Sequence, residues 1–174
     1  MNPIVCFDVH YRESWARAAA VGIESWEDGT PSFERTQTFE GVASYVPGQF
    51  YRRELPLILG LLHSLRADSI EPALLVIDGY VWLGDEESPG LGGHLWNALD
   101  RRAPVVGVAK NTMTIAAPCQ AITRGRSTRP LFVSSAGIPT DRAARHVERM
   151  AGDSRFPAVL KRVDRLCRDG RLAR

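Results

Sequence analysis

The chain has 174 residues, of which 44% are apolar and 24% are charged. This length supports one well-filled core and gives no compositional reason for a second domain, so we expect a single domain over residues 1–174. The formal net charge of +2 neither requires nor excludes a polyanionic partner. Three cysteines lie far apart without metal-finger spacing, which suits free thiols in a reducing compartment and predicts a cytoplasmic protein. The sequence has no signal-peptide pattern and no run near the roughly 20 apolar residues that span a bilayer, so we expect no membrane partner.

The first third of the sequence favours an antiparallel meander followed by a helix. Residues Pro3–Val9 are β-branched and aromatic, which predicts a buried strand that ends near Asp8. Residues 15–24 are Ala-rich and fit either a helix or a strand, whereas alternation over Phe33–Val42 predicts a strand that forms a hairpin with them. Apolar residues then recur at helical spacing, which predicts a helix over Gln49–Arg66 that covers the sheet.

The rest of the sequence alternates strands with helices. The predicted strands are Ala73–Ile77, Pro104–Ala109 and two short strands within Gln120–Ser134, and the predicted helices are 91–100, Asp141–Ala151 and about Ala158–Arg168. Together these elements predict an α/β fold with a mixed β-sheet, an antiparallel opening meander and flanking helices.

Two aspartates stand where open α/β sheets usually place their ligands. Asp8 and Asp78 each lie at the carboxyl end of an apolar strand, so they converge if the two strands are neighbours. Charged carboxylates in an apolar layer cost several kcal/mol unless a cation compensates them. Ligation by oxygen alone favours Mg²⁺ or Mn²⁺ over zinc. The alternative is that each aspartate only caps a turn, since Asp before Gly is a common turn dipeptide.

Two further acids are candidate ligands. Glu54 lies on the predicted helix that packs over the sheet, and its alternative role is an ion pair with Arg52 or Arg53. Asp164 lies in a helix rich in basic residues, so its alternative role is a salt-bridged face in contact with solvent. The sequence pattern alone leaves both choices open.

Seven segments in a fixed order resemble endonuclease V, over nearly the whole chain. They read FDVHY, YVPGQFYRREL, LLVIDG, LGGHL, VVGVAKN, RPLFVSSAG and RFPAVLKRVD. The least generic is YVPG followed by an aromatic residue, Arg and Glu. The resemblance implies a ribonuclease H-like fold and a metal-dependent endonuclease that cuts nucleic acid beside inosine, the nucleoside that carries a deaminated adenine.

The resemblance also implies a role for each matching residue. It assigns Asp8, Glu54, Asp78 and Asp164 to a metal site that takes Mg²⁺, with Mn²⁺ as a substitute. Lys110 matches a lysine beside the scissile phosphate. We therefore expect these five residues to form the catalytic site.

Further matches concern substrate binding. Tyr45, Val46, Pro47 and Gly48 match a wedge that enters the duplex beside the damaged base. Gly79 and Gly137 match positions near the lesion pocket, where a missing side chain lets an extruded base approach closely.

The hairpin RGRSTRP carries three arginines. Arg124, Arg126 and Arg129 either neutralise backbone phosphates or form a solvated basic turn. Trp82, in the segment after Asp78, either stacks on a base or packs in the fold.

The chain also departs from the family pattern. The segment YVWLGDEESPG lacks the usual His-Pro-Arg, and Gly84 or Asp85 stands in place of the histidine. The acidic trio Asp85, Glu86 and Glu87 either adds a metal ligand or repels phosphate. His94 matches a second family histidine, and we expect it to be a structural helix residue. SSAG replaces a glycine-histidine pair.

The resulting hypothesis is an endonuclease that hydrolyses a phosphodiester bond 3′ to inosine in DNA or RNA, acting as a monomer. One alternative is a nuclease of the same fold with another nucleic-acid target. Another is a binding module that cuts poorly or not at all. Carboxylates that converge favour an enzyme, whereas scattered carboxylates favour the binding module.

Overall fold

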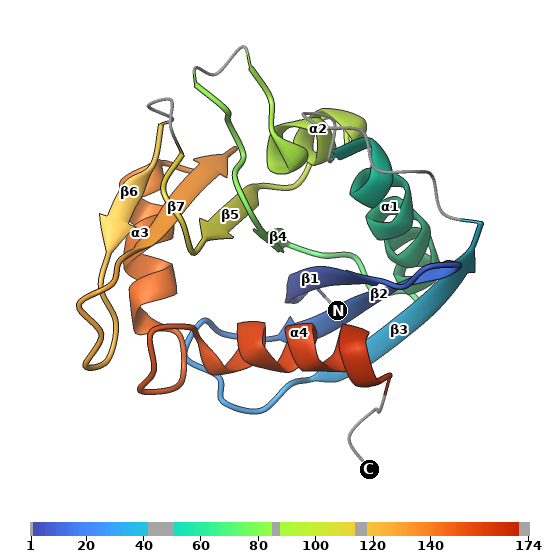
Figure 1. Ribbon diagram of the computed structural model, residues 1–174, viewed down its shortest axis with the longest axis horizontal. Helices are drawn as coiled ribbons and strands as arrows, with labels where there is room; N and C mark the ends of the chain where they lie inside the picture. The colour runs from blue at the N-terminus through green and yellow to red at the C-terminus, as the bar shows by residue number, and fades with distance from the viewer. Residues whose placement is uncertain (1, 42–50, 85–87, 114–117, 171–174) are drawn as a thin grey trace.

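A seven-stranded mixed β-sheet, in the order β3-β2-β1-β4-β5-β7-β6, forms the centre of the computed structural model (Figure 1). The structure describes residues 2–41, 51–84, 88–113 and 118–170. The strands are β1 Ile4–Tyr11, β2 Trp15–Ile23, β3 Phe33–Glu40, β4 Leu74–Asp78, β5 Val105–Ala109, β6 Gln120–Ile122 and β7 Leu131–Ala136. The helices are α1 Tyr51–Ala67, α2 Leu91–Ala98, α3 Thr140–Arg149 and α4 Ala158–Asp169.

The opening meander is antiparallel, as predicted. The Ala-rich segment forms strand β2, because its small side chains pack on both faces of the sheet while its backbone pairs with β1 and β3. The prediction that the first strand ends near Asp8 is wrong. β1 continues to Tyr11, because β2 supplies backbone partners as far as the pair Tyr11↔Ala16.

The three central strands β1, β4 and β5 run parallel to one another. The pairing of β1 with β4 stops at Phe7↔Ile77, so β1 extends past the end of its neighbour. β7 then runs antiparallel to β5, and β6 pairs with β7. The four residues of β1 that follow Phe7 therefore extend beyond the carboxyl end of β4, where they have no β4 residue paired with them.

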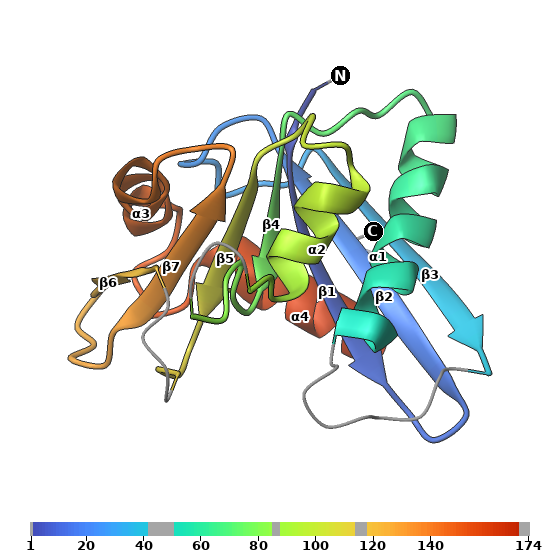
Figure 2. The same ribbon diagram turned by 90° about the horizontal axis from the view of Figure 1, so that it is seen from above.

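Helices cover both faces of the sheet, as Figure 2 shows. α1 and α2 pack over one face, with a core that includes Phe7, Leu61 and Ile77. α3 and α4 pack over the other face, with a core that includes Cys6 and Val163. The predicted mixed sheet with flanking helices is confirmed. No helix in the described ranges is long and apolar enough to cross a membrane.

Candidate active site

A cavity of about 380 Å³ opens where β1 runs past β4, and four carboxylates line it: Asp8, Glu54, Asp78 and Asp164. We call it the carboxylate cavity. Gly79 and Lys110 line it too. The structure thus brings together all five residues expected to be catalytic, from β1, α1, β4, α4 and the end of β5.

Strand register explains why the two aspartates meet. Asp8 and Asp78 directly follow the paired residues Phe7 and Ile77 on parallel strands, so they lie side by side. Cys6 and Val76, two residues earlier, belong to the core under α3 and α4. Because side chains alternate along a strand, both aspartates point toward α4. Glu54 reaches the same cavity from α1, on the other face.

The carboxylates are costly to ionise together. Burial, and then the negative charge of Asp78, raise the pKa of Asp8 to about 7. Burial, followed by the charges of Asp8 and Asp78, raises the pKa of Glu54 well above its ordinary value. Neither Arg52 nor Arg53 forms an ion pair with Glu54 among the described residues, and Arg53 instead lies over the ring of Tyr11. The cavity therefore favours protons or a bound cation.

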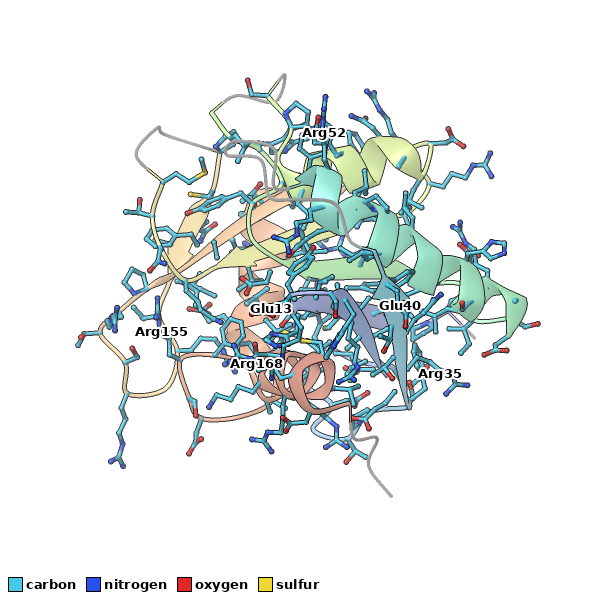
Figure 3. The ribbon with its side chains drawn as sticks, turned by 45° about the vertical axis from the view of Figure 1, so that its right-hand side comes forward. Glu13, Arg35, Glu40, Arg52, Arg155 and Arg168 are labelled. Carbon is cyan, nitrogen blue, oxygen red and sulfur yellow. The ribbon has the colours of Figure 1, made fainter. Side chains whose placement is uncertain are left out.

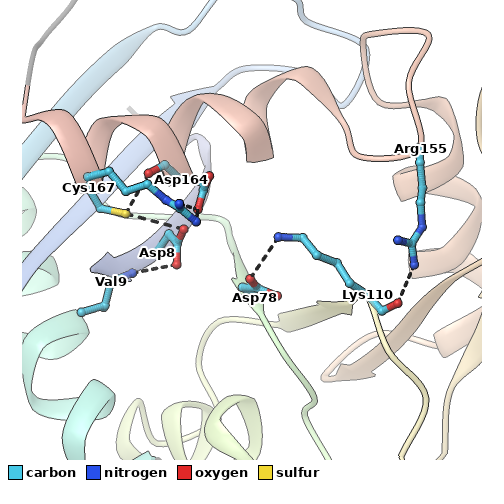
Figure 4. A network of polar contacts seen from close by, with 8 residues as sticks. Asp8, Val9, Asp78, Lys110, Arg155, Asp164 and Cys167 are labelled. Carbon is cyan, nitrogen blue, oxygen red and sulfur yellow. Dashed lines mark hydrogen bonds and ion pairs between the residues drawn. The ribbon is translucent and has the colours of Figure 1, made fainter. Parts of the chain in front are cut away.

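Two side-chain cations already contact the rim (Figure 4). Lys110 Nζ lies 3.8 Å from Asp78 Oδ2. Arg168 donates from Nε and Nη2 to Asp164 Oδ1, at 3.1 and 2.9 Å. The Cys167 thiol lies 3.6 Å from Asp8 Oδ2 and 3.0 Å from the Asp164 carbonyl oxygen, and it can donate to either.

The donor chemistry of the cavity fits a hard divalent cation. Four carboxylates supply the oxygen ligands that Mg²⁺ and Mn²⁺ prefer, and their mutual repulsion is what such a cation relieves. Among the described residues, however, no three His, Cys, Asp or Glu side chains already converge as a ready-made metal site. Cation binding therefore requires side-chain rearrangement at the rim, where Lys110 and Arg168 now contact Asp78 and Asp164.

The position of Lys110 depends on residues that the sequence analysis did not single out. Arg155 Nη2 donates to the carbonyl oxygens of Lys110 and Pro130. The Lys110 ammonium also lies 4.2 Å from the centre of the Phe156 ring. Arg155 and Phe156 begin the segment RFPAVLKRVD, so the sequence marked the segment but not these two roles. Figure 3 shows Arg155 and Arg168 on the α4 side of the molecule and Arg52 on the α1 side.

The structure corrects the expectation for Arg124. Its side chain is only 5% exposed. Its guanidinium donates to the carbonyl oxygens of Glu148, Met150, Gly152 and Ser154. Arg124 therefore ties the chain between α3 and α4 to the end of β6, and it has no donors directed at a phosphate. Arg126 and Arg129 are exposed and remain available to solvent.

Gly137 does not lie beside the carboxylate cavity. Gly137 follows Ala136, which pairs with Val105 at the start of β5, whereas Asp78 pairs with Val108. The glycine thus lies beyond the opposite end of β5, roughly 13 Å along the strand from Asp78. Its φ of +77° and an ideal Cβ only 3.2 Å from Pro104 Cα explain why a glycine stands there.

The remaining candidates divide into packing residues and undescribed ones. Trp82 is 7% exposed and donates from Nε1 to the Ser135 carbonyl, so it packs in the fold. His94 stacks on Tyr51 at 3.6 Å between ring centres, a structural contact as expected. The wedge residues Tyr45, Val46, Pro47 and Gly48 and the acidic trio Asp85, Glu86 and Glu87 lie outside the described residues.

The loop that carries Gly79 packs closely on β5. An ideal Cβ on Gly107 would stand 2.4 Å from the Gly79 carbonyl oxygen. Ser134 Oγ, on β7, accepts a 2.9 Å hydrogen bond from the Val81 amide. Sequence reasoning missed Gly107 and Ser134, because only the strand order shows that this loop crosses them.

Known proteins share this sequence pattern and fold. The family model of endonuclease V matches residues 1–125. Endonuclease V of Streptomyces avermitilis is 31% identical over 78% of this chain and 65% of its own length. Endonuclease V of Streptomyces coelicolor is 31% identical over 87% of this chain and 70% of its own length. The chain therefore spans about two thirds of the length of these relatives.

The fold comparison agrees with the sequence comparison. Endonuclease V of Ciona intestinalis, solved with a 24mer DNA containing an inosine followed by a ribo-adenosine, superimposes with a TM-score of 0.81. That match is 18% identical and covers 97% of this chain and 85% of the other. The ribonuclease H-like fold and the resemblance noted in the sequence are both confirmed. The chain belongs to the endonuclease V family.

Proposed function

We propose that this protein is a metal-dependent endonuclease that hydrolyses a phosphodiester bond on the 3′ side of inosine in nucleic acid. The observation that carries the proposal is the convergence of Asp8, Glu54, Asp78 and Asp164 with Lys110 in one open cavity. Its second support is the family, whose members are nucleases that generally need a divalent metal. Cleavage at the second phosphodiester bond would leave 3′-hydroxyl and 5′-phosphate ends.

The residues divide into two roles. The four carboxylates would hold divalent cation, Mg²⁺ with Mn²⁺ as a substitute, which when bound supplies positive charge to the reacting phosphate. Lys110 would contact the phosphate from the cavity mouth, where its side chain is 41% exposed. Gly79 has a φ of +113°, and apart from its chain neighbours no atom of the described residues lies within 4 Å of the place where a Cβ would stand, so it would leave room for an extruded base.

Outer contacts would come from exposed residues. Arg126 and Arg129 project from the hairpin before β7 and would neutralise backbone phosphates. The wedge residues Tyr45 to Gly48 would enter the duplex beside the lesion. A nuclease of this fold with another target remains the alternative, because the segment after Asp78 lacks the family histidine and its Trp82 is used for packing.

A nicking assay tests the proposal. Matched DNA and RNA oligonucleotides, with and without one inosine, are incubated with the protein in Mg²⁺, in Mn²⁺ and in chelator. We expect metal-dependent cutting one nucleotide beyond inosine and none in chelator. Equal cutting of the inosine-free strands would support the alternative target, and the absence of cutting in every metal would overturn the proposed activity.

Matched variants connect the activity to the cavity. Asp78→Asn should abolish cutting while leaving binding to inosine-containing strands intact. Asp68→Asn is the control, because Asp68 is an exposed aspartate that pairs with Arg35 away from the cavity. Full activity of the Asp78→Asn protein would show that the carboxylate cavity takes no part in the reaction.

A further inference from the structure

His10 lines the carboxylate cavity but has no role in the proposed chemistry so far. Its Nε2 atom is buried and has no hydrogen-bond partner among the described residues. A buried polar atom left unpaired costs about 1–3 kcal/mol. Because this atom lies in a cavity whose carboxylates would bind a cation under the proposed function, that cation is a candidate partner for it.

Strand geometry places His10 next to Asp8. The two residues are two positions apart on β1, so both side chains point toward α4. Their Cα atoms are about 7 Å apart in an extended strand, a spacing that one cation between the two side chains can bridge. Asp164 lines the same cavity from α4, together with the cation Arg168 that binds it.

One oxygen of Asp164 is left for such a cation. Both hydrogen bonds from Arg168 end on Oδ1 of Asp164, and neither uses Oδ2. Asp8, Asp164 and His10 line the same cavity. Because no three such side chains converge among the described residues, a cation would have to draw them together. Mg²⁺ takes oxygen ligands almost exclusively, whereas imidazole suits transition-metal ions.

We infer that His10 is a nitrogen ligand of a divalent cation bound between Asp8 and Asp164, and that it gives this cavity a preference for transition-metal ions over Mg²⁺. The inference rests on the proposed function only in requiring a cation in the carboxylate cavity. It identifies a ligand on β1 in addition to the four carboxylates.

Electron paramagnetic resonance of the Mn²⁺-loaded protein tests the inference without measuring activity. Spin-echo modulation detects a nitrogen bonded to Mn²⁺, and labelling the histidines with ¹⁵N identifies that nitrogen as imidazole. The variants are His10→Gln and, as the matched control, His63→Gln, because His63 is exposed on α1 outside the cavity.

We expect nitrogen coupling in the wild-type and His63→Gln proteins and none in His10→Gln. His10→Gln should weaken Mn²⁺ binding by at least about tenfold, and Mg²⁺ binding by less than about threefold, in calorimetric titrations. Absence of nitrogen coupling in the wild type, or its survival in a folded His10→Gln protein, would overturn the inference. If His10→Gln does not fold, the labelled wild type still decides whether a histidine binds the ion.

The nicking assay separates this result from the proposed function. Inosine-dependent nicking in Mg²⁺ together with an all-oxygen Mn²⁺ spectrum would overturn the role of His10 and leave the activity standing. Nitrogen coupling in a protein that cuts no strand would support His10 as a metal ligand and would overturn the proposed endonuclease activity.

Discussion

Lys110 Nζ lies 3.8 Å from Asp78 Oδ2, across the ends of two neighbouring parallel strands. Asp78 is the last residue of β4, and Lys110 directly follows β5. Because Arg155 holds the Lys110 backbone and Phe156 supports the ammonium, the charge stays at the cavity mouth. A phosphate that enters the cavity therefore meets a cation in place.

Replacing Lys110 by methionine keeps the length of the side chain and removes its charge. We expect the single-turnover nicking rate in saturating Mg²⁺ to fall by about 100-fold, because one preorganised donor to a reacting oxyanion contributes roughly that much. Binding of the inosine strand, measured by fluorescence anisotropy, should change far less. Lys161→Met, at an exposed position of α4, is the control and should cut normally. An undiminished rate in Lys110→Met would exclude the lysine from the reaction.

The raised pKa of Asp8 predicts how the stability of the metal-free protein depends on pH. In the unfolded chain Asp8 ionises near its ordinary pKa of 3.8, whereas in the folded protein its pKa is about 7. Between these values the folded state binds more protons, so the free energy of unfolding falls as pH rises from about 4 to about 7. The slope approaches about 1.4 kcal/mol per pH unit for one such group.

Urea titrations in chelator at several pH values between 4.5 and 7.5 measure this slope. Asp8→Asn removes the group and should flatten the profile, whereas Asp68→Asn should leave it unchanged. Glu54 contributes a slope of the same sign, because its pKa is also raised. A profile for Asp8→Asn as steep as that of the wild type would show that Asp8 ionises normally in the folded protein.

Local sequence patterns predicted most elements because each element has its own periodicity. Every strand predicted from an apolar or alternating run is present, and the helix that carries Glu54, predicted over Gln49–Arg66, covers Tyr51–Ala67 of the described residues. The convergence of Asp8 and Asp78 was predictable because each lies on an apolar run that becomes one of two neighbouring parallel strands. The Ala-rich segment was ambiguous because small side chains suit both a helix and a strand buried on both faces.

Contacts between residues far apart in the sequence explain what the sequence could not predict. The sequence could not show that the antiparallel direction of β7 carries Gly137 to the end of β5 that lies away from Asp78. The predicted contact of Arg124 with phosphate was wrong because its side chain binds four backbone carbonyl groups. Those groups belong to residues 24 to 30 positions later in the sequence. No residue near Arg124 in sequence indicates those partners.

Arg124 and Arg126 should respond oppositely to substitution. Arg124→Met leaves several carbonyl groups without donors in a buried site, so we expect the free energy of unfolding to fall by about 3 kcal/mol. Arg126→Met should leave stability within about 0.5 kcal/mol, because the residue is exposed. It should instead weaken binding to nucleic acid and reduce the salt dependence of that binding.

Urea unfolding and anisotropy titrations at several salt concentrations measure both effects. Each variant is the control for the other, since both changes remove one positive charge from the same hairpin. A stable Arg124→Met protein with an altered salt dependence would restore the phosphate-binding role that the structure argues against.

Gly107 should be essential for the position of the Gly79 loop. A methyl group at residue 107 would stand 2.4 Å from the Gly79 carbonyl oxygen and 3.1 Å from the Val81 amide nitrogen. Gly107→Ala must therefore displace the loop, at a cost of about 1–3 kcal/mol in the free energy of unfolding.

Because Gly79 lines the carboxylate cavity, we expect nicking beside inosine to slow by more than about tenfold, since displacement of about 1 Å near a reacting group has effects of this order or larger. Gly29→Ala is the control, because among the described residues apart from its chain neighbours only the Ala151 Cβ, at 3.8 Å, lies within 4 Å of its added methyl group. If the Gly107→Ala and Gly29→Ala proteins had the same free energy of unfolding and the same nicking rate, the position of Gly79 would not depend on close packing of its loop on β5.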